Sequence, residues 1–194
     1  PREITSAGVP IIMKYLEDLH YSKISTVLEL RGLDLEHVPE EVVDVTQLTR
    51  LVLDFNAILE VPLRLCESMT GLTELWVSSN QLTRIPKELC ECLLELTSLR
   101  LNDNRIVQIP LQIGLLTKLV ELRLHNNRVT ILPLEMGQLQ QVENLSLNAD
   151  DMVSPTPELC SRGTKTIIAY LEAIRTARYT RIVDLRALGM ITFP

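Results

Sequence analysis

The sequence predicts an α/β fold, a curved right-handed solenoid with a parallel β-sheet on its concave face and short helices or helical turns on its convex face. Three observations support this prediction. A pattern of leucine, asparagine and proline recurs six times, each copy alternates like a strand before a proline-led turn, and leucine supplies 36 of the 194 residues. Because one copy cannot bury its own leucine face, we expect neighbouring copies to stack around a shared core.

The recurring unit reads L-x-x-L-x-L-x-x-N-x-L-x-x-L-P, with Ile, Val or Met in place of some leucines. Its asparagine position falls at residues 33, 56, 80, 104, 127 and 150, so successive copies are 23 or 24 residues apart. This constant spacing places six repeats within residues 25–155.

Each part of the unit has a predicted conformation. The L-x-L segment has the two-residue period of a strand, and the segment after the proline suits a short helix or helical turn. The asparagine has both donor and acceptor groups, so stacked copies can bond backbone groups in the turn that follows the strand. Leu33 and Asp150 stand in its place in the first and last copies, so the ladder is expected to break there.

This unit resembles the leucine-rich repeats (LRRs) of intracellular proteins of the Ras group, which occur in scaffold proteins and beside the GTPase module of Roco-type proteins. The resemblance covers residues 25–155 and is specific for the fold. It implies an LRR solenoid and a role in protein–protein interaction in cytoplasmic signalling.

A second, longer repeat relates the two ends of the chain. Residues 1–39 align without a gap to residues 156–194, at an offset of 155, with 11 identities that include Tyr15 with Tyr170 and Leu16 with Leu171. The motif resembles the helix that closes the array in intracellular LRR proteins. We therefore expect a closing helix of a preceding array in residues 1–22, a closing helix in 156–178 and the start of a further, truncated repeat in 179–194. Two unrelated amphipathic helices are the alternative, but they leave the match into the next strand unexplained.

Composition and charge exclude several classes of function. A net charge of −6 argues against nonspecific binding to nucleic acid, and no apolar run has the roughly 18 residues of a membrane span. The glycines are isolated, which excludes a phosphate-binding loop, and the His and Cys residues lack metal-ligand spacing, so no cofactor, metal site or catalytic residue is expected. The four cysteines are expected to be reduced thiols of a cytoplasmic protein, with Cys66 and Cys90 as small fillers of the core.

The outward positions of the predicted sheet carry several arginines and the only tryptophan, residues that are enriched in binding hot spots. The arginines favour an acidic partner, and the alternative is that Trp76 merely covers Val52 and Phe55 while the charges pair across strands. His125 and Asp103 share this face, but nothing in the pattern singles out a serine or cysteine beside them. The residues expected to contact a partner are Arg50, Asp54, Phe55, Glu74, Trp76, Arg100, Asp103, Arg105, Glu121, Arg123, His125 and Arg128.

These observations predict a noncatalytic interaction scaffold or adaptor that binds a protein or peptide on its concave face and is monomeric as an isolated segment. One alternative is a regulatory or substrate-recruiting LRR segment of a larger enzyme, such as a Roco-like GTPase or a kinase. A second alternative is an architectural spacer.

Overall fold

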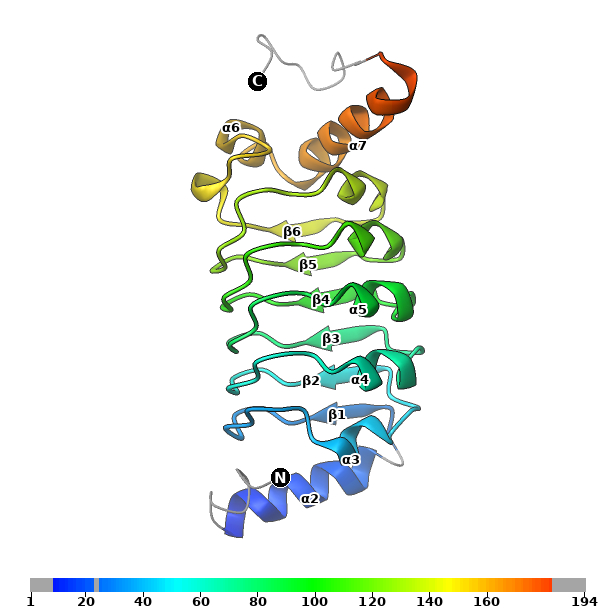
Figure 1. Ribbon diagram of the computed structural model, residues 1–194. Coiled ribbons are helices and arrows are strands. Elements are labelled where there is room, and N and C mark those ends of the chain that lie inside the picture. Colours follow the sequence, from blue (N-terminus) through cyan, green and yellow to red (C-terminus); the bar gives the residue numbers. More distant parts are fainter. Residues whose placement is uncertain (1–8, 23–24, 183–194) are drawn as a thin grey trace.

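The computed structural model describes residues 9–22 and 25–182 and arranges them as a stack of repeats (Figure 1). Six three-residue strands pair in parallel, in the order in which they occur along the chain, and each strand pairs its central leucine with the next. The predicted α/β solenoid with a parallel sheet is therefore confirmed. The strands are β1 (Val27–Glu29), β2 (Arg50–Val52), β3 (Glu74–Trp76), β4 (Ser98–Arg100), β5 (Glu121–Arg123) and β6 (Asn144–Ser146).

A short helix or helical turn follows the proline of each of the first five repeats, on the side of the stack opposite the sheet. The proline ring fixes φ near its helical value. Proline also has no backbone N–H that would need an acceptor at the start of a helix, so the helix can begin directly after it. These elements are α3 (Glu40–Val43), α4 (Leu63–Ser68), α5 (Lys87–Cys92), η1 (Leu111–Leu115) and η2 (Leu134–Gln138).

The longer repeats have the longer outer helices. The two intervals of 24 residues between ladder positions contain α4 and α5, which are six-residue α-helices. The 23-residue intervals contain the four-residue α3 or the tighter 3₁₀ turns η1 and η2. One additional residue thus accompanies an outer helix of six residues, whereas the shorter repeats have outer helices of four or five residues.

The interior is an aliphatic core that runs the length of the stack. The strand leucines from Leu28 to Leu122 are fully buried, and Leu145 is partly buried at the end of the sheet. Cys66 and Cys90 are also buried in this core, which confirms their predicted role as small fillers. Burial raises the pKa of both thiols to about 12, so they remain protonated near neutral pH.

The predicted asparagine ladder is present. The Oδ1 atom of Asn80 accepts a hydrogen bond from the Ile58 N–H at 2.9 Å, and its Nδ2 atom donates to the Leu53 carbonyl at 2.9 Å. Asn56, Asn104 and Asn127 make equivalent bonds to the repeat before them. At Asp150 the chain forms the 3₁₀ turn η3 (Ala149–Asp151) instead, so the ladder ends where it was expected to end.

A second ladder, of threonines, was not predicted. The Thr73 hydroxyl donates to the carbonyl of Thr49 at 2.8 Å, and the Thr97 hydroxyl donates to the carbonyl of Thr73 at 3.1 Å. Thr49 bonds to the carbonyl of Thr26 in the same way. These residues stand just before the strands, and the series ends at Val120, which has no hydroxyl.

Helices cover both ends of the stack (Figure 1). Helix α2 (Val9–Ser22) packs on β1, whereas α6 (Pro157–Cys160) and α7 (Thr164–Thr180) lie at the other end, where α7 packs on η2. The closing segment expected in 156–178 therefore contains two helices and not one. Residues 161–163 separate them, with Gly163 at a φ of +92°, and α7 continues to Thr180. Most of the further repeat expected in 179–194 lies outside the described residues, as do residues 1–8.

Candidate partner-binding surface

Trp76 forms the centre of the outward face of the sheet, here called the concave face and defined by the outward residues of β2 to β5. The guanidinium carbon of Arg100 lies 3.8 Å from the centroid of the indole ring, and that of Arg50 lies 5.3 Å from it. Trp76 is half-buried, whereas Val52, its register partner on β2, is almost fully buried. The indole thus covers Val52 and still presents part of its surface to solvent.

Ion pairs hold the arginines of this face in place. Arg50 Nη2 lies 2.6 Å from Glu74 Oε1, a pairing of charges across strands of the kind that the alternative interpretation expected. Arg100 pairs with Glu121 rather than with Glu74, at 2.9 Å, and Arg123 pairs with the other oxygen of Glu121 at 2.7 Å. The centre of the face is consequently an ordered network in which much of the positive charge is balanced.

Glu121 connects three neighbours within this network. Burial of its carboxyl group alone would raise the pKa, but hydrogen bonds from the Ser98 hydroxyl and from Arg100 and Arg123 outweigh that effect and lower the pKa below its usual value. Glu121 is therefore held as a carboxylate at neutral pH and orients both arginines.

Phe55 combines an exposed ring with an unusual backbone. Its φ is +58° and the residue is 59% exposed, while the guanidinium carbon of Arg31 lies 5.5 Å from its ring centroid. The equivalent position before the ladder residue also has positive φ in other repeats, where it is occupied by residues that tolerate this region better. Those residues are Gly32, Ser79, Asp103 and Asn126.

Asp54 is buried, contrary to the prediction from the sequence. It was expected to contact a partner, but it is only 5% exposed. Its Oδ2 atom pairs with Arg31 at 2.9 Å, and its Oδ1 atom accepts a hydrogen bond from the Ser78 N–H at 2.8 Å. The long side chain of Arg31 reaches across from the first repeat, so Asp54 supports the sheet and is not available to a partner.

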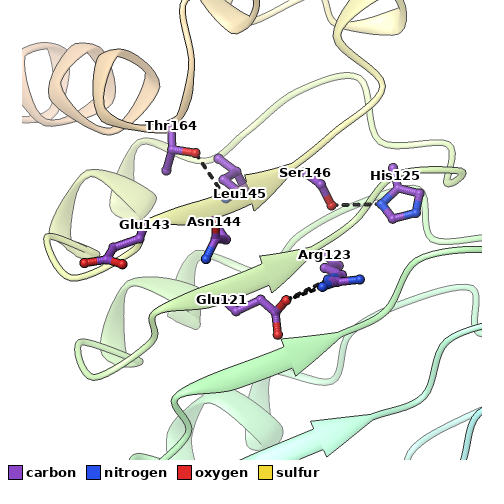
Figure 2. Close-up of a pocket in the computed structure, with 8 residues that line it drawn as sticks. All are labelled: Glu121, Arg123, His125, Glu143, Asn144, Leu145, Ser146 and Thr164. Carbon is purple, nitrogen blue, oxygen red and sulfur yellow. Dashed lines mark hydrogen bonds and ion pairs between the residues drawn. The ribbon is translucent and has the colours of Figure 1, made fainter.

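The end of the concave face near α7 is hollowed (Figure 2). A cavity of about 400 Å³ lies over β5 and β6. Thr164, at the start of α7, lines it, and its Oγ1 atom accepts a hydrogen bond from the Leu145 N–H of β6 at 3.1 Å. The residues that line it are Glu121, Arg123, His125, Glu143, Asn144, Leu145, Ser146 and Thr164.

His125 and Ser146 meet in this hollow, a contact that sequence reasoning missed. His125 Nδ1 lies 2.8 Å from Ser146 Oγ (Figure 2). The Asp103 carboxylate accepts hydrogen bonds from Asn126 and Asn102, at 2.7 and 2.6 Å, and these bonds lower its pKa. Both oxygens of Asp103 are thereby engaged elsewhere, so the three residues do not form the hydrogen-bonded series of a catalytic triad.

Arg105 and Arg128 lie beside the concave face rather than on it. Each follows a ladder asparagine, and its backbone N–H donates to the preceding repeat, to Leu82 and Ile106 respectively. Both side chains are exposed, and neither forms an ion pair with another residue in the described part of the chain. They form an uncompensated basic edge next to the balanced centre.

Residues 9–22 and 25–182 contain neither a membrane-spanning helix nor a cluster of metal-ligating side chains. Within these ranges no helix combines the length and apolar character needed to cross a bilayer. In the same part of the chain, no group of three His, Cys, Asp or Glu side chains is placed to hold a metal ion.

Comparison with known proteins agrees with this geometry. The model of the family described as leucine rich repeat matches residues 46–106. The chain contains leucine-rich repeats. The chain also superposes on internalin C2 from Listeria monocytogenes, with a TM-score of 0.57 and 25% identity over 63% of its own length and 51% of that structure.

Two other solved structures are similar to the chain. One is the LRR ectodomain of a plant membrane receptor kinase from Arabidopsis thaliana, solved in complex with Casparian strip integrity factor 2. It matches with a TM-score of 0.51 and 35% identity, over 57% of this chain and 14% of that one. The other is the LRR domain of a Shigella effector, with a TM-score of 0.53 and 24% identity over 69% of this chain and 55% of that one.

The chain thus spans about half or less of the length of these structures. No curated protein matches it. The comparisons concern the repeats, and the Ras-group subtype and the Roco-type closing helix remain predictions.

Proposed function

We propose that this chain is a noncatalytic protein–protein interaction module, a scaffold or adaptor, that binds a protein or peptide partner on its concave face. The observation that carries the proposal is the partly exposed Trp76 held between Arg50 and Arg100 at the centre of the sheet. Tryptophan and arginine dominate binding hot spots because they offer large contact areas and several hydrogen bonds.

The rigidity of this surface supports the proposal. Ion pairs and cation–π contacts already fix the arginine and tryptophan side chains, so little conformational freedom is lost when a partner binds. The LRR fold suggests an interaction module, and the similar plant ectodomain was solved in complex with Casparian strip integrity factor 2. This support is general, because the chain covers only 14% of that structure.

The distribution of charge suggests how the partner is recognised. Glu74 and Glu121 balance most of the charge of Arg50, Arg100 and Arg123, so an apolar or planar group suits the indole at the centre. Acidic groups of the partner would meet Arg105 and Arg128 at the basic edge. We also propose a cytoplasmic location for a monomeric module, a location that the free thiols of Cys66, Cys90, Cys92 and Cys160 support.

Peptide-display selection against the full chain tests this function. For the selected peptides, Trp76→Ala should weaken binding by at least roughly tenfold, as expected for a hot-spot residue, and Trp76→Ala with Arg100→Glu should abolish it. Arg64→Ala is the matched control, because Arg64 lies in α4 and is 65% exposed. Selected peptides that bind all three variants equally well would refute the proposed concave-face site.

A further inference from the structure

Helices α2 and α7 occupy equivalent positions in the 155-residue repeat, yet their side chains are buried differently. Met13 and Leu16 of α2 are each 51% exposed, whereas their equivalents Ile168 and Leu171 of α7 are 5% and 0% exposed. Glu17 and His20 are also more exposed than their equivalents in α7. The four positions are spaced i, i+3, i+4 and i+7, so they form one face of a helix.

In α7, the equivalent face packs on the last repeat of this array. Helix α7 contacts η2 directly, and a methyl group added to Gly137 of η2 would overlap the backbone of Glu172. Gly114 of η1 is covered in the same way by the backbone of Glu135 in η2. Helix α7 therefore takes the place that the outer turn of a further repeat would occupy.

The opposite face of α2 packs on the repeat that follows it. Tyr15 is buried, and its hydroxyl donates to Glu41 of α3 in the first repeat at 3.5 Å. Its equivalent in α7, Tyr170, is only partly buried. Each helix thus has one face for the array before it and one for the array after it, and in α2 the face for a preceding array is open.

We propose that the open face of α2, formed by Met13, Leu16, Glu17 and His20, is a docking surface for the last repeat of another leucine-rich array that precedes it in the same polypeptide. The docked repeat would have a glycine in its outer turn, as at Gly137, because the backbone at Glu17 needs the same close approach as that at Glu172. A hollow of about 440 Å³ lined by Leu16, Glu17, His20 and Tyr21 lies on this face. The proposal stands independently of any partner on the concave face.

A tandem fusion tests this assignment. Residue 1 corresponds to residue 156, so residues 1–155 of a first copy are joined directly to residue 1 of a second copy that contains all 194 residues. Met13 of the first copy is changed to Leu, so that only Met13 of the second copy remains. The remaining Met13 is then followed by mass spectrometry during oxidation with hydrogen peroxide. Docking should slow its oxidation about tenfold relative to the single chain, because oxidation requires access to the sulfur.

Controls separate docking from other causes of protection. Gly137→Leu in the first copy should restore rapid oxidation of Met13, whereas Gly71→Leu should not, because the space beside Gly71 is open. Equal oxidation rates of Met13 in the fusion and the single chain would overturn the proposal. The proposal would also be overturned if Met13 in the Gly137→Leu fusion became oxidised only together with the buried Met69, because that would indicate unfolding and not loss of docking. Protection of Met13 that rises with concentration in the single chain would assign the face to association between copies, and would also overturn it.

Discussion

Arg100 links Trp76 on one neighbouring strand to Glu121 on the other. Its guanidinium carbon lies 3.8 Å from the centroid of the indole ring, and its Nε donates to the Glu121 carboxylate at 2.9 Å. The strands β3, β4 and β5 are therefore connected on the outward face by side chains as well as by backbone hydrogen bonds. Because Arg100 is only 26% exposed in its side chain, these interactions are partly shielded from water.

A double-mutant cycle on this pair should show coupling. Trp76→Leu and Arg100→Ala should each destabilise the chain, and their combined effect should fall short of the sum by about 1 kcal/mol, the range of a partly desolvated cation–π contact. Urea unfolding followed by circular dichroism measures all four proteins. Additivity within about 0.3 kcal/mol would show that the contact contributes no coupling. Trp76→Phe is a useful comparison, because it retains an aromatic face and removes the indole N–H.

The repeat architecture could be predicted because its determinants are periodic. The positions of Leu51, Leu75 and Leu99 follow from two-residue alternation within strands and from constant repeat spacing, and the structure places them in register. The bonds of Asn80 follow equally from its position at the end of a strand. The change from α4 and α5 to η1 and η2 coincides with the change in repeat length from 24 to 23 residues.

The candidate site was less predictable because side-chain coverage depends on contacts between repeats. Alternation shows that Asp54 points outward, but its burial depends on where the flexible side chain of Arg31 ends. The approach of Ser146 to His125 likewise depends on the rotamers of two residues on adjacent repeats. Sequence reasoning identified the direction of each side chain, whereas the partners had to come from the structure.

Phe55→Asn should stabilise the chain despite the loss of a large side chain. A non-glycine residue in the left-handed region costs about 1–3 kcal/mol, and asparagine tolerates that region better than phenylalanine. Since Phe55 is 59% exposed, the replacement sacrifices little burial, and the exposed contact with Arg31 contributes about 0.5–1 kcal/mol. We expect a net gain of about 0.5–1 kcal/mol in urea unfolding.

Phe55→Leu is the comparison for this prediction, because leucine has no preference for positive φ and should give no gain. If Phe55→Asn were less stable than Phe55→Leu, backbone strain at this position would not be the dominant effect.

Glu121→Gln should change how stability depends on pH. The folded-state pKa of Glu121 is depressed, so its contribution is fully present above the unfolded value of about 4.5 and is lost as pH falls through the lower folded value. At pH 7 the variant should lose about 1–3 kcal/mol, because a neutral amide replaces an acceptor of charged hydrogen bonds. The difference should shrink as pH falls below about 4. Urea unfolding at several pH values provides the measurement, and a difference that stays constant from pH 7 to pH 3 would contradict this role of the carboxylate.

Gly137→Ala should detach or displace the closing helix. The added methyl group would overlap the backbone of Glu172, which cannot move without shifting α7 as a whole. Overpacking of this kind costs about 1–3 kcal/mol. Amide hydrogen exchange should show the loss of protection first in α7 and then in β6, because α7 packs on η2 and also contacts β6. Gly71→Ala is the matched control, since nothing lies near its added methyl group and its stability should change by less than about 1 kcal/mol. Unchanged protection of α7 in Gly137→Ala would mean that this helix does not depend on close contact with η2 to close the array.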